Sequence, residues 1–245
     1  MKIRADQLLV ERGIFESRAR AQAAIVAGLV TADGAVVRKA SAMLASDAQV
    51  TAEAPHPYVS RGGLKLAAAL DAFGFDPKGR ICLDVGASTG GFTDVLLHRR
   101  AAQVFAIDVG TNQLAWKLRQ DDRVVVLEKT NARNLTSAEI PEPVDLIVCD
   151  ASFIGLAKVL DRAISFAKPK ARMVTLIKPQ FEAGRDEVGK GGVVRDPAVH
   201  DRVCAEAGAW ATSKGWQVIG IEKSPITGPE GNVEFLLAAI HGDPA

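Results

Sequence analysis

The chain is poor in the residues that several protein classes require. It has three cysteines and four histidines among 245 residues. Cys82, Cys149 and Cys204 lie far apart and in odd number, which argues against a disulfide framework and against C-x-x-C redox or metal chemistry. The histidines are equally scattered, so we expect no metal site. Cys82 and Cys149 lie in apolar runs and are expected to be core thiols.

Long hydrophobic runs are also absent. No apolar stretch approaches the roughly 18 to 20 residues that a membrane-spanning helix needs. The opening residues 1–6 lack the apolar region of a secretory signal, so we expect a cytoplasmic protein without a membrane span. The chain is long enough to bury a sizeable core, as one large domain or two unequal ones, which excludes disorder throughout.

The chain has almost no net charge. Lys and Arg number 30 against 29 Asp and Glu, a formal charge of +1, unlike a strongly basic nucleic-acid binder. A sum over the chain does not describe any one surface, however. Basic side chains recur at Arg4, Arg18, Arg20, Lys39, Arg61 and Lys65. The net charge therefore leaves RNA binding open.

Two patterns divide the chain. Residues 1–55 are of short period and partly helical, whereas apolar strand-like runs alternate with amphipathic stretches from about residue 78 onward. Pro55 and Pro57 lie between them, and proline restricts both its own backbone and the preceding residue. We expect a small domain over 1–55, a linker over 56–63 and a larger domain over 64–245.

The first segment has the helix-ending, capping and turn residues of a small α+β domain. A short helix over 6–12 should end at Gly13, because glycine readily takes the left-handed conformation of a helix C-terminus. Ser17 can cap a second helix that ends at Gly28. Asp33-Gly34, between β-forming residues, predicts a hairpin.

Along its whole length this segment resembles the S4 RNA-binding domain. The matching positions are Arg4-x-Asp6, Gly13, Ser17-Arg18, Gly28, Asp33-Gly34, Lys39 and residues 47–50. In that family the helix pair presents basic side chains to RNA phosphates. The resemblance implies RNA contacts by Arg4, Arg18, Arg20 and Lys39. The alternative is that these are ordinary solvated charges on a small domain.

The second segment is predicted to be an α/β domain. Strands are expected at 81–84, 104–108, 124–127, 144–150, 173–178, 217–221 and 234–240. Helix-like stretches separate most of them, which predicts a mostly parallel, doubly wound, Rossmann-like sheet covered on both faces. Ligands bind at the carboxyl ends of such strands, so polar residues there are the first candidates for a site.

The loop after the first of these strands is rich in glycine. It runs from Asp84 through Gly86, Ala87, Ser88, Thr89, Gly90 and Gly91 to Phe92. Asp108 ends the next strand, where an acidic side chain can bind both hydroxyls of a ribose. Together they indicate a cofactor that contains a nucleoside.

Three chemistries compete for this loop. A nicotinamide dehydrogenase would have glycine where Ser88 stands, close to a pyrophosphate. A serine hydrolase fits G-x-S-x-G at 86–90, but the motif follows the first strand of its sheet, and only His200 and His241 follow in the right order. S-adenosylmethionine needs a glycine loop and an acid but has no pyrophosphate, so it fits best.

Four charged residues are expected near the same sheet edge. Asp150 and Lys178 end the fourth and fifth strands, and Glu234 begins the last strand, which reaches that edge if it is antiparallel. Lys65 opens a probable helix through residue 73. Each alone would usually be a solvated or paired charge. The combination could bring two lysines and two acids together beside the cofactor loop.

Residues 60–240 resemble the FtsJ-like ribose 2'-O-methyltransferases, whose Lys-Asp-Lys-Glu tetrad is matched in order by these four residues. With the S4-like segment, the layout resembles the TlyA family of ribosomal RNA cytidine 2'-O-methyltransferases, sometimes called haemolysins. The motifs that match are 60–63, 86–93, Asp150-Ala151-Ser152-Phe153, 178–182 and 228–234.

The resemblance implies a site and a reaction. Lys65, Asp150, Lys178 and Glu234 would be catalytic, with activation of the ribose 2'-hydroxyl assigned to Lys178. S-adenosylmethionine would bind at Asp84, Gly86, Ala87, Ser88, Thr89, Gly90, Gly91, Asp108 and Asn131. Asn131 would contact the adenine or simply serve as a turn asparagine. Arg61 is added to the RNA contacts, and the glycine-rich residues 184–192 would be a lid or a surface loop.

The implied partner is rRNA within ribosomal subunits. Short chains of this family resemble the form that acts only on large-subunit 23S rRNA, whereas longer ones also modify 16S rRNA, so we expect the large subunit first. The rival hypothesis is an S4-type RNA-binding or assembly factor whose cofactor domain does no chemistry. Haemolysis has no support in the sequence, which lacks a strongly amphipathic basic helix.

Overall fold

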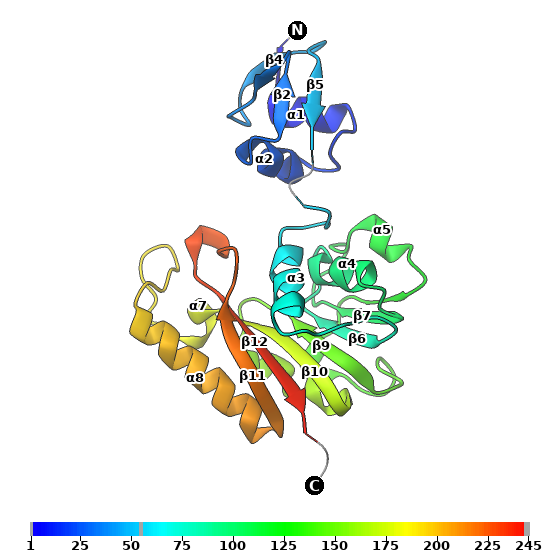
Figure 1. Cartoon of the computed structure of the whole chain (residues 1–245), viewed down its shortest axis with the longest axis vertical. Helices are drawn as coiled ribbons and strands as arrows, with labels where there is room; N and C mark the ends of the chain where they lie inside the picture. The colour runs from blue at the N-terminus through cyan, green and yellow to red at the C-terminus, as the bar shows by residue number, and fades with distance from the viewer. Residues whose placement is uncertain (1, 54–55, 243–245) are drawn as a thin grey trace. The chain divides into compact units, whose positions relative to one another are not determined.

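The structure is a computed structural model that describes residues 2–53 and 56–242. It divides into two compact units, Met1–Pro57 and Tyr58–Ala245 (Figure 1). The domain boundary was expected after residue 55, next to residues 54–55 that lie outside the described residues, and the two units divide after Pro57. Residues 58–63 of the expected linker belong to the second unit, because Val59 is buried in its core and the Val59 N–H donates to Asp94 Oδ2 at 2.7 Å.

The first unit is a small α+β domain. Its elements are β1 (Lys2–Arg4), α1 (Ala5–Glu11), α2 (Arg18–Val26), β2 (Val30–Ala32), β3 (Ala35–Val36), β4 (Met43–Ala45) and β5 (Val50–Ala52). β1 pairs with β4, and β3-β2-β5 form an antiparallel sheet. The predicted turn is confirmed, with φ of 49° at Asp33 and 78° at Gly34. The Ser17 cap is confirmed as well, since its Oγ accepts the Arg20 N–H.

The second unit contains a seven-stranded sheet. Its strands are β6 (Ile81–Val85), β7 (Gln103–Ile107), β8 (Val124–Leu127), β9 (Val144–Cys149), β10 (Ala167–Ile177), β11 (Trp216–Lys223) and β12 (Phe235–His241). The helices are α3 (Gly62–Ala72), α4 (Gly91–His98), α5 (Trp116–Arg119), α6 (Leu156–Leu160), α7 (Pro179–Glu182) and α8 (Pro197–Ser213). Short 3-10 helices lie at Ala132–Asn134, Ala163–Phe166 and Pro229–Gly231.

The strand order is β11-β12-β10-β9-β6-β7-β8. The five strands from β10 to β8 are parallel to their neighbours, and β12 runs antiparallel between β10 and β11. The chain winds outward from β6 to β8 and then returns to place β9 on the other side of β6. The carboxyl ends of β6 and β9 therefore flank a topological switch point, where open α/β sheets bind ligands.

Helices cover both faces of the sheet, as the alternation of strands and helix-like stretches predicted. Along β9, Leu146 and Val148 pack into a core with α3 and α4, whereas Ile147 and Cys149 pack into a core with α6 and α8. This period of two is the alternation of side chains along any strand. Cys82 and Cys149 are buried, as expected of core thiols.

The predicted strands are confirmed, and apart from the start of β10 their ends lie within two residues of the predicted ones. β10 begins at Ala167 rather than 173, because a register shift before Arg172 lets the polar start of the strand rejoin β9. Asp150, Lys178 and Glu234 each lie one residue beyond the strand that was expected to contain them. Within the described residues, no helix is long and apolar enough to cross a membrane.

Candidate active site

The charged residues meet because of the direction of the strands. β9 and β10 are parallel, so Asp150 and Lys178 leave the sheet at the same edge. β12 is antiparallel to β10, and Ile177 pairs with Phe235, so Glu234 lies beside Lys178 at that edge. Lys65 comes from the first turns of α3, which packs against β10 and β12.

The four side chains form a chain of alternating charge. Lys65 Nζ lies 2.5 Å from Glu234 Oε2 and 3.7 Å from Asp150 Oδ2. Lys178 Nζ lies 2.6 Å from Asp150 Oδ1. Asp150 thus bridges the two lysines. Charges of both signs are balanced within the cluster, which is what allows charged groups to be buried.

Burial differs among the four residues. The side chains of Glu234, Lys65 and Lys178 are 0%, 7% and 8% exposed, whereas that of Asp150 is 21% exposed. Glu234 Oε1 is buried without a hydrogen-bond partner among the described residues. Glu234 therefore contacts Lys65 on the buried side of the cluster, and Asp150 is the most exposed of the four residues.

Lys178 has two further contacts, and one of them is to Ser152, which was not expected at the site. Its Nζ donates to the Asp150 backbone oxygen at 3.1 Å and to Ser152 Oγ at 2.8 Å. Ser152 lay within a motif of the family resemblance, but nothing about a lone serine in a loop indicates that it will reach a lysine on another strand.

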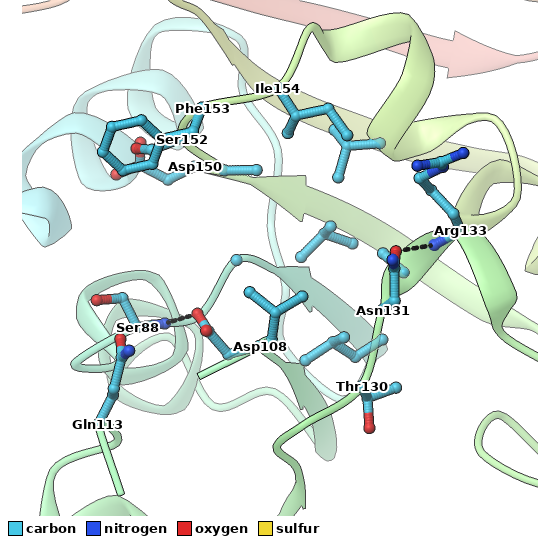
Figure 2. Close-up of a pocket in the computed structure, with 17 residues that line it drawn as sticks. Ser88, Asp108, Gln113, Thr130, Asn131, Arg133, Asp150, Ser152, Phe153 and Ile154 are labelled. Carbon is cyan, nitrogen blue, oxygen red and sulfur yellow. Dashed lines mark hydrogen bonds between the residues drawn. The ribbon is translucent and has the colours of Figure 1, made fainter. Parts of the chain in front are cut away.

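A cavity of about 460 Å³ lies over the switch point (Figure 2). Figure 2 shows Asp150, Ser152 and Phe153 on one side of this cavity and Ser88 and Asp108 on the other. Asp108 Oδ2 accepts the Ser88 N–H at 2.8 Å, and its Oδ1 accepts the Gly110 N–H at 2.7 Å. The acid predicted at the end of the second strand is thus fixed by two backbone groups.

The far end of this first cavity carries Asn131. Its side-chain oxygen accepts the Arg133 N–H at 3.0 Å and caps a short 3-10 helix. Asn131 is therefore a turn asparagine that also lines the cavity, so the two interpretations of this residue are not exclusive. Ile107, Val109 and Ile154 supply apolar wall around it.

A second cavity of about 420 Å³ adjoins the first. Lys65, Asp150, Lys178 and Glu234 all line it, together with the exposed Arg61. The two cavities share Gly86, Ser88, Asp150 and Ser152. The charged cluster thus opens toward one cavity while Asp150 and Ser152 stand at the border with the other.

The glycines of the loop are required mainly because neighbouring protein atoms leave no room for a side chain. Gly86 has a φ of 81°, and a Cβ there would lie 2.8 Å from the Ala151 Cα. A Cβ on Gly90, at a φ of 96°, would lie 2.2 Å from the Leu118 side chain. Gly91 is similarly close to Ser60 Oγ. Gly86 also lines both cavities. Gly91 lines the second, together with the loop residues Ala87 and Thr89.

Asp84 does not lie where the cofactor expectation placed it. Its carboxylate is fully buried and lines neither cavity. Thr93 Oγ1 donates to Asp84 Oδ2 at 2.7 Å, and Oδ1 has no hydrogen-bond partner among the described residues. Burial, first of all, raises the pKa of Asp84 to about 7. The alternation of β6 directs this side chain toward α4, behind the loop.

The geometry argues against a serine hydrolase. His200 Nε2 lies 3.0 Å from the Val194 backbone oxygen, and His241 Nδ1 lies 3.1 Å from the Lys168 oxygen. His241 ends β12 and so lies at the sheet edge opposite Ser88. Among the described residues, neither histidine is bonded to Ser88, and the required nucleophile and base do not meet. No cluster of metal-type ligands occurs among the described residues either.

Two of the arginines expected to bind RNA in the first unit, Arg4 and Arg18, are organised by Asp6. Arg4 Nε lies 3.0 Å from Asp6 Oδ1, and Arg18 Nη2 lies 2.9 Å from Asp6 Oδ2. Gln22 donates to the same carboxylate at 2.8 Å. The Arg4 and Arg18 side chains remain 38% and 51% exposed while the Asp6 side chain is fully buried. Asp6 was part of the motif, but its role as an anchor required the fold.

The sheet order, the glycine loop at the switch point and the acid after β7 define a Rossmann-like methyltransferase. A solved structure from Listeria monocytogenes with a provisional name as an S-adenosylmethionine-dependent methyltransferase shares this fold, with a TM-score of 0.56 over 75% of this chain and 100% of that chain, at 14% identity. The model of the FtsJ-like methyltransferases matches residues 58–240, and that of the S4 domain matches residues 3–50. The chain belongs to the FtsJ-like methyltransferase family and carries an S4 domain.

Two similar proteins cover nearly the whole chain. The 16S/23S rRNA (cytidine-2'-O)-methyltransferase TlyA of Mycobacterium tuberculosis is 50% identical over 238 residues, which are 96% of this chain and 89% of the relative. A solved structure from Streptococcus thermophilus with a provisional hemolysin name is 40% identical, with a TM-score of 0.78 over 99% of this chain and 89% of that one. The predicted family is confirmed.

Proposed function

We propose that this methyltransferase transfers a methyl group from S-adenosylmethionine to the ribose 2'-hydroxyl of cytidine in ribosomal RNA. The observation that carries the proposal is the Lys65-Glu234 and Asp150-Lys178 cluster, which opens into one cavity and borders a second. A reaction between two bound molecules needs two adjoining spaces of this kind. The name and 50% identity of the Mycobacterium tuberculosis relative support the choice of reaction and substrate.

The first cavity suits the cofactor. Each oxygen of Asp108 accepts one backbone N–H, and a carboxylate oxygen can accept about two hydrogen bonds, so each keeps capacity for a ribose hydroxyl. Asn131 and the apolar wall at Val109 and Ile154 suit the adenine ring. Gly86 and Ser88 would lie at the amino-acid end. When bound, S-adenosylmethionine supplies a methyl group activated by a positively charged sulfur.

The second cavity suits the ribose. A 2'-hydroxyl is a weak nucleophile, so the enzyme must orient it and help remove its proton. Lys178 Nζ is the group placed to do so, because Lys178 lines this second cavity. Asp150 fixes this amine through its carboxylate and its backbone oxygen. Lys65 and Glu234 in turn hold Asp150 in place from the buried side.

RNA would be held by basic groups in both units. Arg61 stands at the second cavity, where a backbone phosphate next to the target ribose would come close. Arg4, Arg18, Arg20 and Lys39 would bind phosphates through the S4 domain. Phe153 is 91% exposed beside the first cavity at a φ of 66°, and its ring lies 5.2 Å from that of Phe181, so it offers an aromatic surface to a base that has left its stack.

The test uses radiolabelled S-adenosylmethionine and ribosomal subunits from a strain that lacks the methylation. We expect label in rRNA and, after digestion, in 2'-O-methylcytidine. 23S rRNA is the first substrate proposed, and 16S rRNA is assayed separately because the relative's name includes both. Lys178→Ala should abolish labelling, whereas Lys214→Ala, which removes an exposed lysine paired with Asp161, should not. Label in bases, or full activity of Lys178→Ala, would favour a non-catalytic RNA-binding factor or another reaction.

A further inference from the structure

Lys178 has as many oxygen partners as an ammonium group has hydrogens. Three oxygens lie within 3.1 Å of its Nζ: Asp150 Oδ1 at 2.6 Å, Ser152 Oγ at 2.8 Å and the Asp150 backbone oxygen at 3.1 Å. A protonated lysine has three N–H donors and no acceptor. In this structure the Lys178 amine donates to the Ser152 hydroxyl and to the Asp150 backbone oxygen, and the Asp150 carboxylate lies against it as an ion pair.

The three partners differ in what they can do when Lys178 loses a proton. A neutral amine keeps two N–H donors and gains one lone pair. The carboxylate and the peptide oxygen of Asp150 can only accept hydrogen bonds, so they hold the two N–H groups. Ser152 is the one partner that can also donate, because a hydroxyl carries its own hydrogen. The lone pair of a neutral Lys178 therefore points at Ser152 Oγ.

Ser152 is also within reach of a substrate. It is exposed and lines both cavities, whereas the Lys178 side chain is only 8% exposed. Figure 2 shows Ser152 between Asp150 and Phe153 at one side of the first cavity. A hydroxyl that enters at the border of the two cavities can therefore contact Ser152.

We propose that Ser152 is a catalytic residue that carries the proton of the target 2'-hydroxyl to Lys178, an inference that rests on the proposed function. The 2'-hydroxyl donates its proton to Ser152 Oγ, and Ser152 passes its own hydrogen to Lys178 Nζ, which becomes an ammonium. As the 2'-oxygen bonds to the methyl carbon, the carbon–sulfur bond breaks and sulfur keeps the electron pair. Lys178 then loses one proton to water.

The relay makes two protons move in one step, so the dependence of the methylation rate on deuterium tests it in the unaltered enzyme. Single-turnover methylation is followed in mixtures of light and heavy water, with 2'-O-methylcytidine as the product measured. A curved, two-proton dependence of rate on deuterium fraction is expected. A linear dependence means that a single proton moves, and it would overturn the relay even if every variant failed to fold.

Substitutions test the hydroxyl itself. Ser152→Ala should lower kcat by about 10²- to 10⁴-fold, the usual worth of proton transfer by a positioned group. Its KM for RNA and its affinity for S-adenosylmethionine, measured by equilibrium dialysis, should stay within about threefold. Ser152→Thr, which keeps a hydroxyl, should recover most of the rate. Ser213→Ala, at the exposed end of α8, is the matched control.

A third readout needs neither cofactor nor RNA. In the unliganded enzyme labelled with nitrogen-15 lysine, the Lys178 ammonium hydrogens should exchange with water faster in Ser152→Ala than in the unaltered protein. An unchanged exchange rate, a Ser152→Ala kcat within threefold of the original, or a Ser152→Thr variant as slow as Ser152→Ala would each overturn the inference. If the unaltered enzyme methylates no ribose, the proposed function fails instead.

Discussion

Lys65 Nζ and Glu234 Oε2 lie 2.5 Å apart although the two residues are 169 positions apart in the sequence. The pair joins the start of α3 to the start of β12, and the Glu234 side chain is fully buried. Burial of a charge is tolerated only while its partner is present. This ion pair therefore links the stability of the fold to the geometry of the catalytic cluster.

Removal of either Lys65 or Glu234 should lower stability. Removal of both should restore stability but not activity. Lys65→Met or Glu234→Gln should each lower the free energy of unfolding by about 3–5 kcal/mol, because a single buried charge or polar group remains. The double variant Lys65→Met with Glu234→Met should recover most of that loss, yet it should remain slow because Asp150 is no longer held. Urea unfolding and kcat are measured on all three. A double variant that unfolds as easily as the single ones would contradict this view of the pair.

Asp108 should control cofactor affinity. Asp108→Asn replaces one of two acceptor oxygens with a donor amide that faces a backbone N–H of Ser88 or Gly110. The affinity for S-adenosylmethionine should fall about 10- to 100-fold, in line with the loss of a hydrogen bond to a charged group. Asp122→Asn, an exposed acid between the same strands, serves as the control. Equal cofactor affinity of the two variants by calorimetry would remove Asp108 from the proposed site.

Asp84 should make the methyltransferase unit less stable as the pH rises. Its pKa is about 7 in the fold, because of burial, but about 3.9 in an unfolded chain. Between these values the folded state binds more proton than the unfolded state, so the free energy of unfolding falls from about pH 4 to about pH 7 and then stays level. Asp84→Asn removes this dependence.

The comparison for Asp84 is the difference in Tm between Asp84→Asn and the unaltered protein. This difference should be larger at pH 8 than at pH 5, by several degrees, since about 1 kcal/mol corresponds to roughly 2–4 °C in a domain of this size. Scanning calorimetry resolves the two units if they melt separately. If the difference does not change with pH, Asp84 is ionised in the fold throughout this range.

Asp6 should preorganise the RNA-binding arginines. The Arg4 guanidinium, and after it Gln22 and Arg18, hold the pKa of Asp6 well below its usual range despite the opposing effect of burial. Asp6→Asn should lower the stability of residues 2–53 by about 1–3 kcal/mol and weaken RNA binding, because Arg4 and Arg18 lose their common anchor. The stabilisation in the unaltered protein is present above about pH 4 and is lost as the pH falls below it.

Hydrogen exchange of the full chain reports the stability of residues 2–53, and filter binding reports RNA affinity. Asp47→Asn, at an exposed site in the same unit, is the control. Stability lost without loss of RNA affinity would mean that Arg4 and Arg18 serve only the fold.

Most of the fold could be predicted because it depends on local patterns. Apolar runs such as 144–149 predicted a buried strand, and Asp33-Gly34 predicted a tight turn because few other pairs accept positive φ at both residues. Asp150, Lys178 and Glu234 could be assigned to one edge because the direction of a strand fixes where its end lies. The direction of a single side chain was harder to predict. Asp84 lies at the end of a buried strand, and both faces of that strand looked apolar.

The class of fold, the order of the strands' polar ends and the identity of the charged residues that could react follow from the pattern of residues along the chain. Which of these residues touch depends on how the elements pack: Asp150 bridges two lysines, Ser152 contacts Lys178, Asp84 points at α4, and Asp6 contacts Arg4 and Arg18. Periodicity is set by neighbours along the chain, whereas a hydrogen bond depends on distances of a few tenths of an ångström between groups that the packing of separate elements brings together.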